Sequence, residues 1–405
     1  MNKVIGCILV GAGTAIGGGT LALPIVVAGM GFPLACITLI GIWALSWAAG
    51  LLLLETNLAF KAPHNTFATM SQATLGKAGK WFTSITFMLL LYALTSAYIS
   101  GGASLIQAAS QLLFNHNLPN WINATLFTII LGSIVGWSTR AVDLFNRGLF
   151  SLKAVLLLVV FIIFTPLIDV SQLIDQHEWR YLAAGLPVIF ASFGGHIIIP
   201  SIAPYLDNDV AKLKKVVLFS SLLPLIVYLI WIACMLGSIP YFGENSLATI
   251  ANSPTQVESL IFAINANASA PWISVVINLV SHLLLITSFL GVALSLFDFL
   301  SAKKNAIVAP RGYTALLTFI PPLLIALFYR DALIQLLGFA AIFAAFVVII
   351  VPGLMAWRVR RIPSLHSTYR APGGTVLIAV IIIVALGIVV TEILRILNWL
   401  PIWTG

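Results

Sequence analysis

Gly11-Ala-Gly-Thr-Ala-Ile-Gly-Gly-Gly-Thr-Leu-Ala-Leu-Pro24 is the stretch that decides the fold of this chain. It lies within an apolar run from Val4 to Met30, which as a helix rising about 1.5 Å per residue is long enough to cross a bilayer. Five glycines and a proline within fourteen residues disfavour an unbroken helix. Backbone freed from helical hydrogen bonds at membrane depth must be buried in protein or line a cavity.

Two interpretations of this stretch are open. The small residues could let a neighbouring helix approach closely, as in GxxxG packing, or they could mark a broken helix whose free amides and carbonyls bind a small molecule. A second interruption, Ser192-Phe-Gly-Gly-His-Ile-Ile-Ile-Pro-Ser201, lies in another apolar run and is followed by Pro204. Breaks at corresponding positions of two halves are typical of secondary transporters with inverted repeats, which favours the broken helix.

Composition sets the class of the protein. Of 405 residues, 60% are hydrophobic and 8% are charged, and the mean hydropathy is +1.08, which indicates a polytopic membrane protein. Cys7, Cys36 and Cys234 all fall in apolar runs, so we expect buried thiols and no disulfide framework, metal site or cofactor. The first apolar run is too long for a signal core and lacks an A-x-A-like cleavage site, so no removable signal is expected.

The apolar runs predict an all-α protein with about eleven membrane-spanning helices. They lie at roughly 4–30, 33–60, 82–113, 121–138, 147–167, 182–206, 213–239, 271–301, 312–328, 331–356 and 374–399. The interrupted spans are the first and the sixth, which indicates a repeated five-helix unit. Because five is odd, the second unit enters the membrane with the opposite topology. We expect one domain over 1–405, with repeats at 3–170 and 180–357 and an additional helix at 374–399.

Basic residues predict the orientation. With the N-terminus in the cytoplasm, seventeen of the twenty Lys and Arg fall on the cytoplasmic side. They are Lys3, Lys61, Lys77, Lys80, Arg140, Arg147, Lys153, Lys212, Lys214, Lys215, Lys303, Lys304, Arg311, Arg358, Arg360, Arg361 and Arg370. Only Arg180, Arg330 and Arg395 fall elsewhere. This bias follows the positive-inside rule and explains the net charge of +8 without a nucleic-acid partner.

The two breaks suggest what is transported. The N-terminus of a half-helix presents free N–H groups and a positive dipole end, so Gly17, Gly18 and Gly19 offer a site for an anionic group. A half-helix that ends near Gly11–Ala15 presents carbonyls, and carbonyls from the second break can hold an ammonium. A zwitterion fits both, so α-amino acids are the expected substrate class.

Neighbouring side chains suggest the substrate's own side chain. Phe193 and His196 lie in the second break, and Tyr92, Ser96 and Tyr98 lie in the third span. This aromatic and hydrogen-bonding set suits a ring with a polar tip. The alternative is that buried aromatic residues are simply core, and we favour that for Tyr98. His196 is either a satisfied core histidine or, because an ionisable group at membrane depth is costly, part of the site.

Lys153 is the candidate for ion coupling. It lies seven residues beyond Asn146, about 10 Å along the fifth helix. It either reaches back to the cytoplasmic surface or points inward, where its ammonium would replace the cation of a sodium-coupled transporter. In the second case, Thr287 and Ser288 would contribute hydroxyl oxygens. Because a desolvated lysine titrates readily, we expect coupling to protons rather than to sodium.

Two carboxylates are candidates for a gate. Glu55 lies near the cytoplasmic end of the second helix, where the dipole disfavours it, so it needs a cationic partner that the sequence does not identify. Asp298 is either a solvated helix end or one half of a gate with Lys3. His282 either lines the pathway or forms hydrogen bonds within the bundle.

Six motifs together resemble the bacterial aromatic amino acid permeases of the amino acid/polyamine/organocation superfamily, and most closely the tyrosine-specific members. They are GAGTAIGGGTLALP at 11–24, LLYALTSAYISGG at 90–102, DLFNR at 143–147 followed by Lys153, VIFASFGGHIIIPS at 188–201, TSFLGVALSLFDFL at 287–300 and FIPPLLIALFY at 319–329. The resemblance covers nearly the whole chain.

This resemblance implies a leucine-transporter-like fold of eleven helices, proton-driven tyrosine import, and a multi-pass protein of the bacterial inner membrane with a periplasmic C-terminus. It implies a carboxylate site at Ile16, Gly17, Gly18 and Gly19, and an amine site at carbonyls near Thr14 and Ala15 and at Ser192, Phe193 and Gly194. The expected partners are L-tyrosine and the lipid bilayer, with no nucleic acid and no obligatory protein partner.

Other functions remain as alternatives. A tryptophan-specific or broader aromatic permease is the main one. An intramembrane enzyme would need a nucleophile–base or metal constellation, and HExxH and CxxC are absent from the sequence. An ion channel would lack two paired substrate-binding breaks. An amino-acid sensor would normally carry a soluble output domain.

Overall fold

The computed structural model describes residues 3–60, 65–115, 118–175, 178–266, 271–301, 310–329 and 332–405. Every element assigned within these ranges is helical. Lys61, Lys303, Lys304 and Arg330, four of the basic residues used to predict the orientation, lie outside the described residues. The elements in chain order are α1 (Lys3–Ala15), α2 (Gly18–Val27), η1 (Ala28–Met30), α3 (Gly31–Leu58), α4 (Phe67–Phe114), α5 (Asn120–Trp137), α6 (Thr139–Phe164), η2 (Thr165–Leu167), α7 (Val170–Asp175), η3 (Trp179–Tyr181), α8 (Leu182–Ala191), η4 (Gly194–Ile198), α9 (Ile199–Tyr205), α10 (Val210–Ser238), α11 (Leu247–Asn252), α12 (Gln256–Ala266), α13 (Pro271–Ser301), α14 (Arg311–Phe328), α15 (Leu333–Ala344), η5 (Ala345–Ile350), α16 (Val351–Val359) and α17 (Gly374–Ile396).

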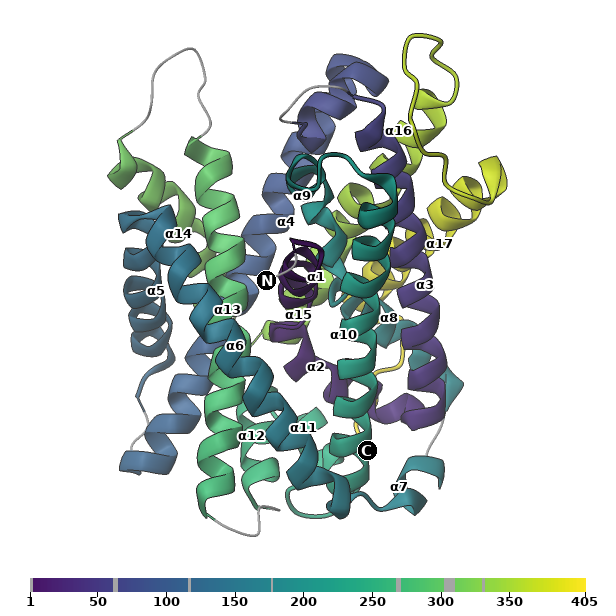
Figure 1. Ribbon diagram of the computed structural model, residues 1–405. Helices are drawn as coiled ribbons and strands as arrows, with labels where there is room; N and C mark the ends of the chain where they lie inside the picture. The colour runs from purple at the N-terminus through teal and green to yellow at the C-terminus, as the bar shows by residue number, and fades with distance from the viewer. Residues whose placement is uncertain are drawn as a thin grey trace.

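The helices form one bundle around the first break. Long helices such as α3, α10 and α13 run along the length of the molecule, and α1 and α2 lie near its centre (Figure 1). α1 packs against α10, α3 packs against α10 and α16, and α4 packs against α13 and α15. Helices from the first and second halves of the chain therefore pack against one another in the interior.

Ten helical segments of the described chain are long and apolar enough to cross a membrane, whereas about eleven spans were expected. The difference arises at the first break. α1 is a shorter apolar helix, and α2 continues through η1 into α3 as one apolar segment, Gly18–Leu58, of 41 residues. The chain turns within this segment at Gly31, whose positive φ of 72° suits glycine. α2 and α3 thus belong to different crossings of the bundle.

Both predicted helix breaks are present. α1 ends at Ala15 and α2 begins at Gly18, with Gly17 in a non-helical conformation of φ −155° and ψ −141°. In the second half, α8 ends at Ala191 and helical structure resumes with the 3-10 helix η4 (Gly194–Ile198) before α9. Glycine lowers the helix propensity at both places, and these amides and carbonyls need partners from elsewhere in the bundle.

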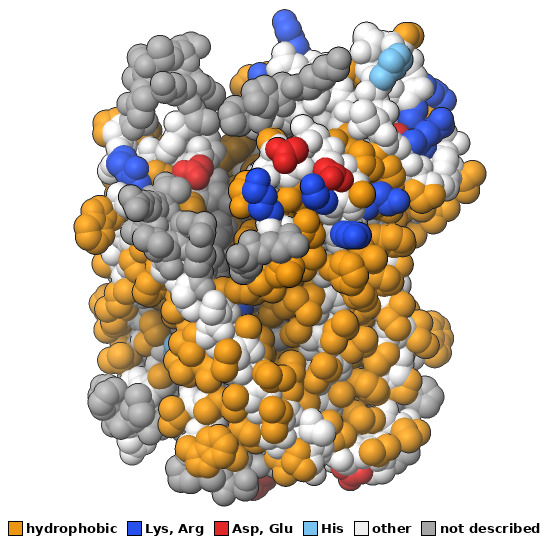
Figure 2. Space-filling view, viewed as in Figure 1, with side chains coloured by type: hydrophobic (Ala, Val, Ile, Leu, Met, Phe, Trp, Pro, Cys, Tyr) orange, Lys and Arg blue, Asp and Glu red, His pale blue; other side chains and the backbone are white. Residues whose placement is uncertain are grey.

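The surface is apolar around the middle of the molecule. Figure 2 shows a broad hydrophobic belt, above which Lys and Arg side chains gather on the same end as the turns that follow α9 and α16. Large exposed apolar side chains such as Ile37, Ile129 and Val376 belong to the helices of this bundle. An apolar surface of this extent is suited to lipid rather than to water.

Candidate functional site

Lys153 of α6 points into the protein at the first break. Its ammonium donates hydrogen bonds to the Ile16 carbonyl at 2.7 Å and to the Thr287 hydroxyl at 2.9 Å. It also lies over the Phe150 ring, 5.1 Å from the centroid. Only 1% of the residue is exposed, so Lys153 does not reach the cytoplasmic surface. The carbonyl that it contacts belongs to Ile16, one residue beyond the end of α1.

Thr287 and Ser288 are adjacent on α13 but face different parts of the break. The Thr287 hydroxyl accepts from Lys153 and donates to the Leu283 carbonyl at 2.7 Å. The Ser288 hydroxyl accepts a hydrogen bond from the Gly18 amide at 3.3 Å. The two hydroxyls were expected to act together at the cation site, and in the structure only Thr287 contacts Lys153. Successive helical residues differ in direction by about 100°, which explains the division.

The three consecutive glycines of the first break allow side chains to approach the backbone. A Cβ at Gly17 would lie 1.7 Å from the Ser288 hydroxyl oxygen, and one at Gly19 would lie 2.4 Å from the Ser192 hydroxyl oxygen. At Gly18 it would lie 2.7 Å from the ring of Tyr98. In this conformation, protein groups therefore occupy the space that the glycines leave open.

The amides of the break are only partly satisfied. Gly18 N–H donates to Ser288, and Thr20 N–H donates to the Gly17 carbonyl at 2.9 Å. Among the described residues, no acceptor is found for the amides of Gly17 and Gly19. These two N–H groups stand at the positive end of the α2 dipole, where an anionic group is favoured.

Thr14, which was predicted to lie near the amine site, is exposed, and its hydroxyl donates to the Val10 carbonyl of its own helix at 2.9 Å.

The second break places a histidine against a widened turn of another helix. His196 Nε2 lies 3.2 Å from the carbonyl of Val348 in η5, a π-helical turn. A carbonyl only accepts, so Nε2 carries the proton and Nδ1 of the neutral ring is an acceptor. Nδ1 is buried and has no partner among the described residues. His196 thus has Nε2 bound to Val348, and the Phe193 backbone also lies close to the ring.

The other members of the second break lie close to the first. The Ser192 hydroxyl donates to the Val188 carbonyl at 3.0 Å and approaches Gly19. Phe193 is buried. A Cβ at Gly194 would meet no atom within 4 Å, so this position faces open space. At the next residue, Gly195, a Cβ would lie 2.6 Å from the Gly11 carbonyl oxygen, so η4 packs directly on α1.

Two tyrosines occupy the site that the sequence did not assign to it. Tyr228 of α10 is fully buried, and its hydroxyl contacts the carbonyls of Ala15 at 2.6 Å and Ser192 at 2.8 Å. Its ring packs edge-on against Phe193. Tyr98, expected to be core, lies against Gly18. A polar-tipped residue within the apolar run of the seventh span is the signal that could have identified Tyr228.

Tyr92 and Ser96 face other neighbours. The Tyr92 hydroxyl donates to the Leu317 carbonyl of α14 at 2.8 Å, which directs this side chain away from the breaks. The Ser96 hydroxyl is buried and donates to the Tyr92 carbonyl of its own helix at 2.8 Å. Tyr92 was predicted to line the pocket, and Tyr98, almost two helical turns further on, takes that place. Which residue faces the break depends on how α4 is rotated in the bundle.

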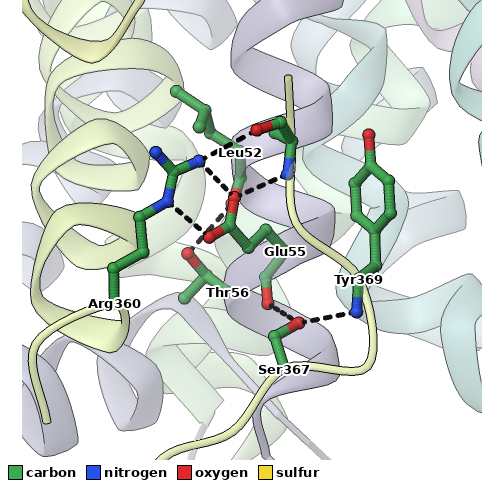
Figure 3. Close-up of polar contacts among 7 residues, drawn as sticks. Leu52, Glu55, Thr56, Arg360, Ser367 and Tyr369 are labelled. Atoms are coloured by element: carbon green, nitrogen blue, oxygen red, sulfur yellow. Dashed lines mark hydrogen bonds and ion pairs between the residues drawn. The ribbon is translucent and has the colours of Figure 1, made fainter. Parts of the chain in front are cut away.

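Glu55 forms a clamp between α3 and the segment after α16. Arg360 donates to both carboxylate oxygens, from Nε and from Nη2, at 2.7 Å each (Figure 3). The Ala371 amide donates to the same carboxylate at 2.9 Å, and the Ser367 hydroxyl donates to the Glu55 carbonyl at 2.7 Å. The bond to the carboxylate raises the pKa of the Arg360 guanidinium. Arg360 is the cationic partner that Glu55 was expected to need.

The remaining gate candidates do not meet. Lys3 lies over the Tyr205 ring, 5.2 Å from its centroid, and no ion pair joins Lys3 to Asp298, both of which are described. Asp298 has Arg311 as its nearby charge. The Lys3–Asp298 gate is therefore not formed in this conformation. His282 Nδ1 lies 2.7 Å from the Asn278 carbonyl, so it bonds within its own helix.

Comparison with known proteins decides the family. The sequence profile of the tryptophan/tyrosine permease family matches residues 1–393, which is nearly the whole chain. The chain belongs to the tryptophan/tyrosine permease family. It is therefore a transporter and not an enzyme, and the aromatic amino acid permease function that the motifs predicted is confirmed.

Individual relatives of this permease cover almost its full length. It is 34% identical to tyrosine-specific transport system 1 of Haemophilus influenzae, over 97% of this chain and 96% of that protein. It is 32% identical to tyrosine-specific transport system 2 of the same organism, over 100% of this chain and 99% of the relative. It is also 32% identical to the tryptophan-specific transport protein of Pseudomonas aeruginosa, over 98% and 96% of the two chains.

Proposed function

We propose that this permease imports tyrosine across the bacterial inner membrane by proton symport. The observation that carries the proposal is the buried ammonium of Lys153, which binds the Ile16 carbonyl at the first break and the Thr287 hydroxyl. A lysine charge there does the work that a bound metal cation would do. Because an amine can lose its proton, the group that holds the break can be switched.

The switching step follows from the charge of Lys153. The protonated amine donates to the Ile16 carbonyl and ties α6 and α13 to the end of α1. The neutral amine is a weaker donor, so its hydrogen bonds to the Ile16 carbonyl and the Thr287 hydroxyl weaken. A conformational equilibrium shifts by the difference in interaction between its two states, so proton loss favours the state in which α1 is less tightly held. Proton release to the cytoplasm would then accompany substrate release.

The substrate class is supported by the two breaks. The unsatisfied amides of Gly17 and Gly19 suit a carboxylate at the N-terminus of α2. The carbonyls of Ala15 and Ser192, which converge on one hydroxyl, suit an ammonium. Together they would hold the two charges of an α-amino acid.

Tyrosine as the preferred substrate is supported by two of the relatives and by His196. The relatives from Haemophilus influenzae are described as tyrosine-specific. Nδ1 of His196 is a buried acceptor with no partner in the described structure, and a phenolic hydroxyl could donate to it. The tryptophan-specific relative makes tryptophan the second candidate, since an indole N–H is also a donor.

We further propose that residues 3–170 and 180–357 form two inverted five-helix repeats, with the N-terminus in the cytoplasm and the C-terminus in the periplasm. Support for the repeats comes from the positions of the two breaks, at the start of each half. Support for the orientation comes from the basic residues gathered at one end of the apolar belt (Figure 2).

Transport by purified protein in proteoliposomes tests this proposal. Uptake of labelled tyrosine is measured under an imposed pH gradient, under a sodium gradient, and with neither. We expect accumulation with the pH gradient alone, and tryptophan and phenylalanine should compete less effectively than tyrosine. Accumulation driven by sodium would contradict proton symport, and faster uptake of tryptophan would favour the second candidate.

Variants of Lys153 assign the coupling. Lys153→Ala should abolish accumulation driven by a pH gradient, and Lys153→Arg should also fail because a guanidinium keeps its charge. Lys215→Ala, which removes an exposed lysine of α10, is the matched control and should accumulate tyrosine normally. If Lys153→Ala accumulates tyrosine as well as the control, Lys153 does not couple transport to protons.

A further inference from the structure

The hydroxyl of Tyr228 joins the two broken helices. Its oxygen lies 2.6 Å from the Ala15 carbonyl oxygen and 2.8 Å from the Ser192 carbonyl oxygen. Ala15 ends α1 and Ser192 caps α8, so these carbonyls are at the negative ends of two half-helices. One side chain of α10 therefore links the first half of the chain to the second at the centre of the bundle.

This hydroxyl cannot satisfy both carbonyls. A phenol has a single proton to donate, and two acceptors at helix C-termini compete for it. An ammonium carries three N–H groups and a positive charge, so it would satisfy both carbonyls and leave one donor over. The buried Thr20 hydroxyl lies beside the Tyr228 hydroxyl and can either accept its proton or donate to its oxygen. The two carbonyls and the Thr20 oxygen thus compete for the single phenolic proton.

The ring of Tyr228 keeps its hydroxyl at this place. The residue is fully buried, and the ring packs edge-on against Phe193 with 5.3 Å between centroids. Phe193 directly follows Ser192 in the second break, so the ring and the hydroxyl contact the same segment. Rotation of the O–H bond alone can change which carbonyl receives the proton, and it can also turn the oxygen toward an incoming donor.

We propose that the Tyr228 hydroxyl stands in for the substrate ammonium when the transporter is empty. This rests on the proposed function, in which the ammonium binds between the Ala15 and Ser192 carbonyls. With substrate bound, the ammonium donates to both carbonyls, and the Tyr228 hydroxyl is no longer needed as their donor. Without substrate, the hydroxyl is the hydrogen-bond donor that the two carbonyls share, so that α1 and α8 move as a unit when the empty protein returns to its starting conformation. Tyr228 is then a positioning residue for the return step.

The proposal separates two transport modes. In net uptake, the empty transporter must change from the inward-facing to the outward-facing conformation in every cycle. In exchange of external for internal substrate, the transporter carries a substrate in both directions and never changes conformation while empty. Loss of the Tyr228 hydroxyl should therefore slow net uptake and spare exchange. A role in binding the substrate alone would affect both modes equally.

The experiment compares wild type, Tyr228→Phe and Tyr241→Phe in proteoliposomes. Tyr241→Phe is the matched control, because Tyr241 is a buried tyrosine before α11 whose ring packs on Trp403 rather than on a break. Exchange is measured as entry of labelled tyrosine into vesicles filled with unlabelled tyrosine, and net uptake as entry into empty vesicles under a pH gradient. We expect Tyr228→Phe to keep exchange within about twofold of wild type and to lose net uptake by about tenfold, the effect of losing one buried hydrogen bond in one step. Tyr241→Phe should keep both modes.

Two results would overturn the proposal. If Tyr228→Phe keeps net uptake, the hydroxyl is not needed for the return step. If it loses exchange as much as net uptake although purified Tyr228→Phe unfolds at the wild-type Tm, the hydroxyl acts with substrate bound and the proposal is wrong. Thermal unfolding of the variant in detergent, measured beside wild type, separates this result from misfolding. Wild type that exchanges tryptophan but not tyrosine would instead refute the proposed substrate, and the same comparison is then made with tryptophan.

Discussion

Three buried polar side chains, Lys153, Tyr228 and His196, bind backbone carbonyls that irregular helix geometry leaves without their usual hydrogen bonds. Lys153 binds the carbonyl of Ile16, Tyr228 binds two carbonyls at half-helix ends, and His196 binds a carbonyl of the π-helical turn η5. Burial of a polar group is costly unless it is hydrogen-bonded, and unpaired carbonyls in an apolar interior carry the same cost. Each hydrogen bond satisfies both the buried side chain and the unpaired carbonyl. These residues and these breaks therefore occur together.

His196 gives a prediction of substrate selectivity. A site that hydrogen-bonds a substrate hydroxyl rejects the analogue that lacks it. If Nδ1 of His196 accepts from the tyrosine hydroxyl, His196→Ala should raise the KM for tyrosine roughly tenfold more than the KM for phenylalanine, because about 1.4 kcal/mol is a factor of ten. Competition of each amino acid against labelled tyrosine provides the measurement.

His282→Ala is the matched control for this selectivity, since His282 bonds to its own helix α13. It should leave the ratio of the two KM values unchanged. Equal losses for tyrosine and phenylalanine in His196→Ala would assign His196 to packing of the second break.

At the scale of elements, α3 and the segment after α16 are held together by the clamp of Glu55. The carboxylate receives three hydrogen bonds, two from Arg360 and one from the Ala371 amide. The side chains of Glu55 and Arg360 are 2% and 7% exposed. When one partner of a surface ion pair is removed, water solvates the charge that remains. In a buried bidentate pair, water cannot reach the remaining charge, so its loss of a partner is costly. The clamp therefore fixes where the chain between α16 and α17 lies.

Glu55→Gln tests this clamp. The amide has the same shape but leaves the Arg360 charge buried without a counter-charge, so the variant should be destabilised by roughly 3–5 kcal/mol. Thermal unfolding of the purified protein in detergent should show a Tm several degrees lower. Glu178→Gln removes one partner of an ion pair whose side chains are about half exposed, Glu178 with Arg180, and should change stability by less than about 1 kcal/mol. A Tm for Glu55→Gln equal to that of Glu178→Gln would refute the clamp.

At the scale of the whole molecule, charge is distributed unevenly across the apolar belt. Lys and Arg gather at one end of the face shown in Figure 2, and this end also carries the segment between α16 and α17 (Figure 1). Basic residues flanking apolar helices are retained in the cytoplasm during insertion. The loop that precedes α11 lies at the opposite end (Figure 1) and should face the periplasm.

Cysteine labelling tests this orientation. In a background with Cys7, Cys36 and Cys234 replaced, Ser364→Cys and Glu244→Cys each introduce one thiol at an exposed position of a described loop. In spheroplasts, a membrane-impermeant maleimide should label Glu244→Cys, and it should label Ser364→Cys only after the membrane is permeabilised. The reverse pattern would invert the topology.

The sequence by itself determined the helical spans and both breaks, because these depend on local composition. A run of apolar residues forms a helix in a bilayer wherever it lies, and glycine and proline weaken it whatever its neighbours. The two breaks, at 11–19 and 192–196, could be predicted from the sequence for the same reason. The spans 4–30 and 33–60 were also separated correctly, at a place where the turn at Gly31 leaves no polar gap between α2 and α3.

Only the tertiary structure decided which side chains reach the breaks. Tyr98 rather than Tyr92 meets Gly18, and Thr287 rather than Ser288 meets Lys153, because the rotation of each helix about its axis is set by packing against the other helices. Neighbouring residues on a helix point about 100° apart, so a pattern in one span cannot show which of them faces a particular partner. Arg360 is separated from Glu55 by 305 residues, and their contact exists only because folding of the whole chain brings α3 beside α16.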